Sequence, residues 1–370
     1  MKELEPWPGR HIVRCFLTWL LLFLSLPYVT AQEPETAWHA ARSSRNMIAS
    51  VHPLATEAGL QVFREGGNAV DAAVATALTL GVVDGFNSGI GGGCFVLIRS
   101  ASGQITAIDG REMAPAAAHR DMYLRNGKPD GRLSRTGSLA SGVPGALAAY
   151  EQAVRENGVM KFRDLILAAA DVAENGFEVD ENYHRRLTEV SGILRQFDGS
   201  RQVLLRDNGK PWRTGDILVQ KDLAATYRNI ADRGIGWFYQ GEFAAATAAW
   251  MKEHGGIMTA RDFANYRTVI RKPVTTDYRG YTVIGFPPPS SGGVHVAQIL
   301  NILEAFDLRA LYREHPARMT HVVAEAMKLA FADRAYWLGD PDFVIVPQGL
   351  VDKAYAKKLA AGIQPVSYTH

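Results

Sequence analysis

The sequence predicts an α+β fold, in which helices and strands occur in separate blocks. Residues 146–254 carry apolar side chains mostly at helical spacing, whereas residues 94–109 and 277–286 are strand-like. Because the strands do not alternate regularly with helices, a doubly wound parallel sheet is not expected. The chain has 370 residues, of which 47% are hydrophobic and 21% charged, so it can bury a sizeable core.

Two helices are expected before the first strand. Pro53 suits the first position of a helix and Gly66-Gly67 suits its end, with apolar side chains at helical spacing between them. Asn68 can cap a second, alanine-rich helix over residues 69–83. Because this second helix has little polar surface, we expect it to be buried on several sides.

A β-hairpin is expected next. Residues 94–98 form a continuous apolar run, which predicts a fully buried strand. Ser102-Gly103 can turn the chain into a second strand over residues 105–109. The preceding glycines, residues 91–93, favour tight backbone packing over a phosphate-binding loop, because a strand follows them and no Lys-Ser/Thr pair is present. The hairpin ends at Arg111.

The remainder of the chain is expected to be mainly helical. Helical spacing over residues 146–196 is interrupted at Gly158 and Gly176. A strand pair or meander over residues 277–286 leads directly into three consecutive prolines. Further helices are expected at residues 221–234, 242–254, 294–306, 317–336 and 354–363, with a short one beginning at Thr259.

The N-terminus predicts secretion. Basic residues precede an apolar stretch at residues 15–26, and small residues at 29–31 suit a cut before Gln32, which is the pattern of a signal peptide. A retained membrane anchor is the alternative, although the stretch is short for a span. We expect a periplasmic or secreted protein without a stable membrane anchor. Removal of residues 1–31 would leave Cys94 as the single cysteine and exclude an intrachain disulfide.

The charge balance argues against nucleic acid as a partner. The chain has 40 Lys and Arg residues and 38 Asp and Glu residues, which gives a net charge of +2. The histidines lack the spacing of metal ligands, so neither a metal nor a cofactor is expected. Cys94 lies within the apolar strand, where it is expected to behave as a small hydrophobic residue rather than a nucleophile.

Arg111 is the strongest candidate for ligand binding. It stands between Gly110 and a turn that ends at Pro115. An arginine held by rigid backbone can present a planar fork of donors to a carboxylate. From the spacing alone, a surface ion pair at the strand end is the simpler interpretation.

Residues 287–293, Pro-Pro-Pro-Ser-Ser-Gly-Gly, do not form a nucleophile elbow, because the Gly-x-Ser-x-Gly frame is missing. Ser290 or Ser291 is better suited to cap the helix that follows, and the glycines would let that helix approach a neighbour closely. Asp333 and Arg334 close the helix over residues 317–336. Either could support the site, but a cap or a local ion pair is the simpler interpretation.

Two motifs in this order carry a family resemblance. Ile-Asp-Gly-Arg-Glu-Met-Ala-Pro at residues 108–115 and Pro-Pro-Pro-Ser-Ser-Gly-Gly at residues 287–293 resemble the γ-glutamyltransferase family of N-terminal nucleophile hydrolases. The resemblance extends from about Met47 to Ile363. It implies a four-layer αββα fold, with two stacked sheets between helical layers, that is incomplete here because the small subunit is missing.

The resemblance also implies a chemistry. In the family, autoproteolysis makes a threonine the N-terminus of a small subunit. The threonine hydroxyl, with its own α-amino group as base, attacks the γ-glutamyl carbonyl of a substrate such as glutathione, and the acyl-enzyme passes to water or an amino acid. Only Arg111 carries over, as the partner of the glutamyl α-carboxylate. Glutaryl-cephalosporin acylases and poly-γ-glutamate transferases share the fold and remain alternatives, as does a non-catalytic secreted fragment.

The catalytic threonine is not expected in this chain. Thr320 falls within a predicted helix, and Thr369 lacks the extended segment that should precede the family's Thr-Thr-His. One choice of codons for residues 366–370 reproduces the end of a transposase-based sequencing adaptor, so residues 365–370 are expected to be an artefact. Residues 32–364 would then be a large-subunit portion, whose expected partners are a γ-glutamyl substrate and the missing small subunit. The chain alone is expected to be inactive.

Overall fold

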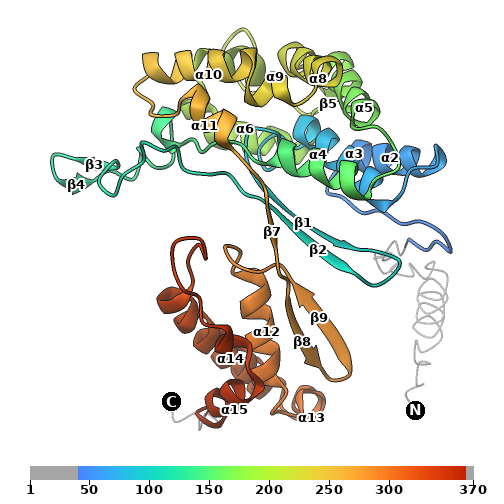
Figure 1. The fold of residues 1–370 in the computed structure, drawn as a ribbon, viewed down its shortest axis with the longest axis vertical. Helices are drawn as coiled ribbons and strands as arrows, with labels where there is room; N and C mark the ends of the chain where they lie inside the picture. Colours follow the sequence, from blue (N-terminus) through green and yellow to red (C-terminus); the bar gives the residue numbers. More distant parts are fainter. Residues whose placement is uncertain (1–40, 364–370) are drawn as a thin grey trace, which may run out of the picture. The chain divides into compact units, whose positions relative to one another are not determined.

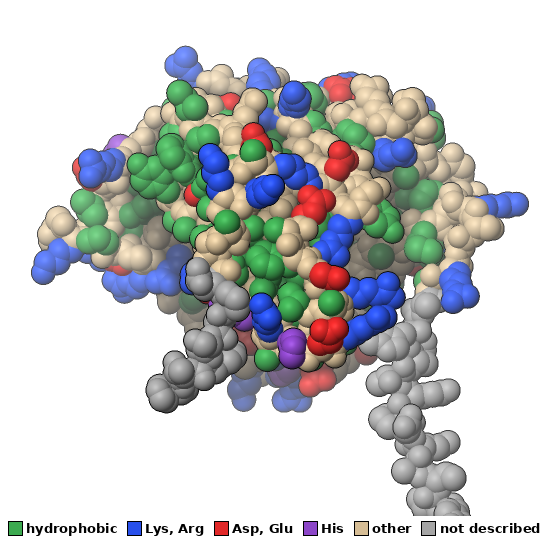
Figure 2. Space-filling model, turned by 90° about the horizontal axis from the view of Figure 1, so that it is seen from below, with side chains coloured by type: hydrophobic (Ala, Val, Ile, Leu, Met, Phe, Trp, Pro, Cys, Tyr) green, Lys and Arg blue, Asp and Glu red, His purple; other side chains and the backbone are tan. Residues whose placement is uncertain are grey.

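The computed structural model describes residues 41–363 (Figure 1). The expected signal peptide and the expected artefact at residues 365–370 lie outside this range. The chain divides into two units, Met1–Arg45 and Asn46–His370, and all elements below belong to the second. Across residues 41–363, no helix is long and apolar enough to cross a membrane. Positive, negative and hydrophobic side chains are interspersed on the face shown in Figure 2.

The first two helices are confirmed. Helix α2 spans Pro53–Arg64, and helix α3 spans Ala69–Val83. The Asn68 side chain accepts from the N–H groups of Val70 and Asp71, and the Asp71 carboxylate accepts from the Asn68 N–H. This reciprocal capping explains where α3 begins. Two thirds of the α3 residues are buried, as expected from its composition.

Strands β1 (Cys94–Arg99), β2 (Ile105–Gly110) and β7 (Val269–Arg271) form an antiparallel sheet in the order β1-β2-β7. The β1–β2 hairpin is confirmed, with Cys94 opposite Gly110. The prediction of a fully buried β1 is wrong, because its side chains alternate in burial and Phe95 and Leu97 remain 37% and 42% exposed. Figure 1 shows helices on one side of the hairpin, and because successive strand residues point to opposite faces, every second β1 side chain lies on the face away from these helices.

The helical region follows the predicted boundaries closely. Helices α4 and α5 end at Gly158 and Gly176, where the breaks were expected. The short elements at residues 198–204 and 236–239 were not predicted, since fewer than eight residues give little periodic signal. The helices of this region are α4 (Ala146–Asn157), α5 (Phe162–Asn175), α6 (Glu181–Leu194), α7 (Asp198–Leu204), α8 (Lys221–Arg233), α9 (Gly236–Tyr239), α10 (Glu242–Glu253) and α11 (Ala260–Asn265).

A second core lies in the C-terminal part. Strands β8 (Val274–Tyr278) and β9 (Tyr281–Gly285) form the expected hairpin. Helix α12 packs against both strands and against α14 and α15. The helices here are α12 (Gly292–Leu303), α13 (Leu308–Glu314), α14 (Pro316–Trp337) and α15 (Lys353–Ala361). The remaining short elements are β3 (Leu124–Arg125), β4 (Lys128–Pro129), β5 (Phe177–Glu178), β6 (Ile217–Leu218), η1 (Ser138–Ala140) and η2 (Gln348–Val351).

Gly293 sets the distance between α12 and β9. A Cβ atom at this position would overlap the carbonyl oxygen of Phe286 and lie 2.9 Å from the carbonyl carbon of Gly285. Gly292 is different, since its nearest such neighbour is the Ser290 hydroxyl at 3.5 Å. The predicted close approach of the helix therefore depends on the second glycine of the pair.

Candidate functional site

The two motifs identified in the sequence meet in the structure. Arg111 follows directly after β2, and its guanidinium Nη1 lies 3.5 Å from the Pro289 carbonyl oxygen, 178 residues further along the chain. The rings of Phe95 and Phe286 are also in contact, with their centres 4.3 Å apart. The Arg111 guanidinium carbon lies 5.8 Å from the centre of the Phe95 ring. The strand end and the proline-rich segment therefore form one site.

The backbone of Arg111 is held on both sides. Its N–H donates to the Asp109 carboxylate at 3.0 Å, and its carbonyl oxygen accepts from the Tyr266 hydroxyl at 2.8 Å. Gly93 permits a third close approach, because a Cβ there would lie 2.7 Å from the Arg111 Cα. Both peptide groups of Arg111 are thus fixed by side chains.

The guanidinium of Arg111, by contrast, is held less firmly than its backbone. Its side chain is exposed, and within residues 41–363 no carboxylate lies within ion-pair distance of it. Among the described residues, the guanidinium makes one hydrogen bond, the long contact with the Pro289 carbonyl. The surface ion pair that spacing alone favoured is not found in this part of the chain. A fixed backbone and an unpaired planar fork are what binding of a carboxylate requires.

A largely buried ion network supports the strand end. The Arg271 guanidinium binds the second oxygen of Asp109 at 3.0 Å and both oxygens of Asp342, at 2.6 and 2.7 Å. The side chains of Arg271 and Asp109 are only 12% and 7% exposed. Hydrogen bonding between Arg271 and Asp342 raises the pKa of Arg271 and lowers the pKa of Asp342. Because Asp109 also accepts from Arg111, the network connects β7 and Asp342 to the candidate site.

The serines of the proline-rich segment do not form a nucleophile. Ser291 occupies the N-cap position of α12 as predicted, but its hydroxyl does not cap the helix. It accepts instead from Arg334 Nε at 3.2 Å, while the Ser290 hydroxyl accepts from the Gly292 N–H. The nearby His295 ring contacts the Ser291 backbone carbonyl rather than a hydroxyl. Within residues 41–363, neither serine therefore has the adjacent base that nucleophilic catalysis needs.

Asp333 and Arg334 form neither the cap nor the local ion pair that was expected of them. Arg334 reaches Ser291, whereas Asp333 accepts from the Tyr355 hydroxyl at 2.9 Å and from the Gln298 amide. Both residues thus join α14 to neighbouring elements. Arg334 adds a second arginine to the proline-rich segment, although the sequence did not identify Ser291 as its partner.

The glycines at residues 91–93 have two roles. Gly93 packs tightly against Arg111 and Glu112, as predicted, but Gly91 and Gly92 face open space. All three line a cavity of about 710 Å³ together with Cys94 and Glu112. Burial raises the pKa of the Cys94 thiol to about 12, which keeps it protonated at neutral pH and supports its interpretation as a hydrophobic residue.

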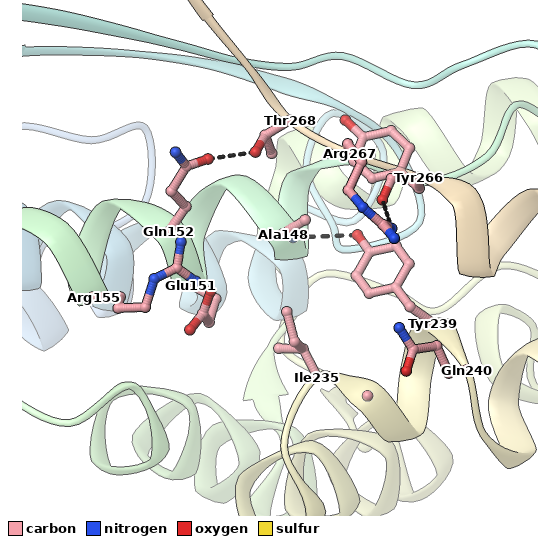
Figure 3. Close-up of a pocket in the computed structure, with 11 residues that line it drawn as sticks. Ala148, Glu151, Gln152, Arg155, Ile235, Tyr239, Gln240, Tyr266, Arg267 and Thr268 are labelled. Atoms are coloured by element: carbon pink, nitrogen blue, oxygen red, sulfur yellow. Dashed lines mark hydrogen bonds and ion pairs between the residues drawn. The ribbon is translucent and has the colours of Figure 1, made fainter.

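Thr320 lies within a helix, as predicted. Thr320 is exposed on α14, where its hydroxyl donates to the Pro316 carbonyl at 3.1 Å. In residues 41–363 no group of three or more His, Cys, Asp or Glu side chains is arranged to hold a metal ion. A separate cavity of about 220 Å³ contains Tyr239 and Tyr266 in its lining but not Arg111 (Figure 3).

Comparison with known proteins identifies the family. Residues 55–370 match the sequence profile described as Gamma-glutamyltranspeptidase. The chain belongs to this family. Among gamma-glutamyltranspeptidases of known structure, the Helicobacter pylori enzyme superimposes with a TM-score of 0.86 and 42% sequence identity. The alignment covers 88% of this chain and 94% of the solved one, and it confirms the α+β fold of the N-terminal nucleophile hydrolase type.

Curated relatives agree with this assignment to the gamma-glutamyltranspeptidases. The Glutathione hydrolase proenzyme of Escherichia coli (strain K12) is 45% identical over 337 residues, which are 90% of this chain and 58% of the relative. The Acylase ACY 1 proenzyme of Pseudomonas sp. (strain SE83) is 40% identical, with coverage of 87% and 59%. The chain therefore spans somewhat more than half the length of these relatives.

Proposed function

We propose that this chain is the large-subunit portion of a secreted γ-glutamyltransferase precursor. Its substrates would be glutathione and related γ-glutamyl compounds, and its acceptors water or amino acids. The 45% identity to the Glutathione hydrolase proenzyme of Escherichia coli supports glutathione as the donor, and the 40% identity to the Acylase ACY 1 proenzyme keeps the acylase as the alternative. The nucleophilic threonine would lie in a small subunit outside this chain, so residues 1–370 alone would have no turnover. A signal peptide would direct the enzyme to the periplasm or the medium and would be removed on export.

The observation that carries the proposal is the state of Arg111. Its peptide groups are fixed by Asp109 and Tyr266, and its guanidinium has no carboxylate partner in the described residues. Every γ-glutamyl donor presents an α-carboxylate that this fork could bind through two parallel hydrogen bonds. Arg111 would thus hold the donor, while the threonine attacks the γ-carbonyl several bonds away.

The test uses Arg111→Lys in the full-length precursor, meaning this chain with its small subunit. Lysine retains the charge but loses the fork. A hydrogen bond to a charged group contributes about 1.5–3 kcal/mol, so kcat/KM for a γ-glutamyl anilide should fall roughly 10- to 200-fold. A second donor that lacks the α-carboxylate should react poorly with both proteins and lose little more on substitution.

Two results would contradict the proposal. If Arg111→Lys slows both donors equally or blocks autoproteolysis, the arginine is structural, because maturation involves no substrate carboxylate. Turnover of a γ-glutamyl anilide by the purified 370-residue chain would show that the nucleophile lies within it. A panel with glutaryl-cephalosporin and poly-γ-glutamate donors would separate the alternative substrates.

A further inference from the structure

We infer that Tyr266 is a positioning residue for substrate binding, because its hydroxyl fixes the carbonyl end of Arg111. This inference rests on the proposed function of Arg111 as the carboxylate ligand. Tyr266 follows helix α11 and is far from Arg111 in sequence, so its contact depends on the fold alone. The hydrogen bond to the Arg111 carbonyl is 2.8 Å long, which is near the usual length for O–H···O.

The Tyr266 ring is itself held in place. It is 6% exposed and stacks on Tyr239, with an interplanar angle of 15° and ring centres 5.7 Å apart. Burial raises the pKa of Tyr266, so the hydroxyl remains a neutral donor across the physiological range. The ionised phenolate, which could not donate, is thus excluded at working pH. The hydrogen bond to the Arg111 carbonyl should therefore persist over the physiological pH range.

A glycine makes room for the hydroxyl. A Cβ at Gly145 would overlap both the Tyr266 hydroxyl and the Gly110 carbonyl oxygen. The start of α4, the end of β2 and the Tyr266 side chain therefore converge within van der Waals distance. This packing leaves the Arg111 carbonyl little freedom to move as long as the hydroxyl is present.

Movement of the Arg111 backbone should weaken substrate binding, because it displaces the guanidinium. The guanidinium is at the end of a long side chain, so a small rotation of the Arg111 peptide displaces the fork by more than the backbone moves. Hydrogen bonds to a carboxylate are sensitive to such displacement, and supporting residues are needed to hold binding groups in their productive geometry. Removal of the hydroxyl should therefore weaken donor binding without affecting the chemical step.

Tyr239 provides a matched control. Its ring forms the other half of the stack, but its hydroxyl donates to the Pro144 carbonyl at 3.0 Å. The same hydroxyl accepts from the Ala148 N–H at 3.2 Å (Figure 3). It has no hydrogen bond to Arg111. Tyr239→Phe and Tyr266→Phe each remove one buried phenolic hydroxyl from the same stack, and only the second removes a contact with Arg111.

The experiment compares the full-length enzyme with these two variants and Arg111→Lys, on a γ-glutamyl anilide and on its analogue lacking the α-carboxylate. Tyr266→Phe should raise KM for the anilide about 3- to 10-fold and change kcat by less than about twofold. Its constants for the analogue should remain within about twofold of the parent values. Tyr239→Phe should lower the melting temperature similarly and leave KM unchanged.

The outcomes separate the two proposals. If Arg111→Lys discriminates between the donors and Tyr266→Phe does not, or if Tyr266→Phe matches Tyr239→Phe in KM, the positioning role is overturned and the proposed function stands. If Arg111→Lys affects both donors equally, the proposed function fails, and this inference fails with it. A selective rise in KM in Tyr266→Phe alone supports the inference, because a general loss of stability would not distinguish the donors.

Discussion

Replacing Gly293 by alanine should destabilise the protein by pushing α12 away from β9. The added Cβ would penetrate the Phe286 carbonyl oxygen and lie 2.9 Å from the Gly285 carbonyl carbon, and both obstacles are backbone atoms. The start of the helix would have to retreat by roughly 1 Å to restore ordinary van der Waals contact. Overpacking of this kind costs about 1–3 kcal/mol. The hydrogen bond from the Gly293 N–H to the Phe286 carbonyl, 3.2 Å long, would weaken as well.

Gly292→Ala is the control for this prediction. A Cβ there has its nearest neighbour at 3.5 Å, and the backbone does not need a positive φ. Thermal unfolding of the two variants, followed by circular dichroism at one scan rate, should show a drop of a few degrees for Gly293→Ala and almost none for Gly292→Ala. If the two variants melt together, the close approach of α12 and β9 does not constrain this position.

Three further outcomes are expected. Hydrogen bonding to Arg271 lowers the pKa of Asp342, so the stabilisation from this carboxylate is present above the unfolded pKa of about 4 and is lost as the pH falls through the lower folded pKa. The melting temperatures of the parent and Asp342→Asn should therefore converge as the pH falls below about 4. A constant difference would contradict this. The Cys94 thiol should resist Ellman's reagent at pH 8 in the folded chain without residues 1–31, and react fully once the chain is denatured. Thr320→Ala should leave autoproteolysis and turnover of the full-length enzyme unchanged, whereas loss of either would reassign the nucleophile.

Local structure was predictable because its causes are local. The capping pair of Asn68 and Asp71, and the similar pair of Thr259 and Asp262, lie three residues apart in the sequence. Glycines at the helix ends carry an equally local signal. Strand β7 was missed because three residues are too few to show a period.

The site was predictable only in part, because its contacts are remote in sequence. Spacing alone placed Arg111 at a strand end, and only the family resemblance connected it with a ligand. Asp109 lies in the same motif and could have been recognised as its neighbour. Tyr266 and Arg271 carry no such signal, since each acts through a contact more than 150 residues away. The predicted cap by the Ser291 hydroxyl was wrong because this hydroxyl accepts a hydrogen bond from Arg334 on α14 instead.

The register of the β1–β2 hairpin has a consequence for folding. Gly110 faces Cys94 across the hairpin, and a Cβ at this point would overlap the methyl group of Ala149 on α4. A slip of one residue would bring Asp109 or Arg111 to this narrow place, and neither side chain could fit under the helix. Gly110 thus selects one strand register by steric exclusion. Only this register lets α4 pack on the hairpin, and it leaves Arg111 one residue beyond the end of β2.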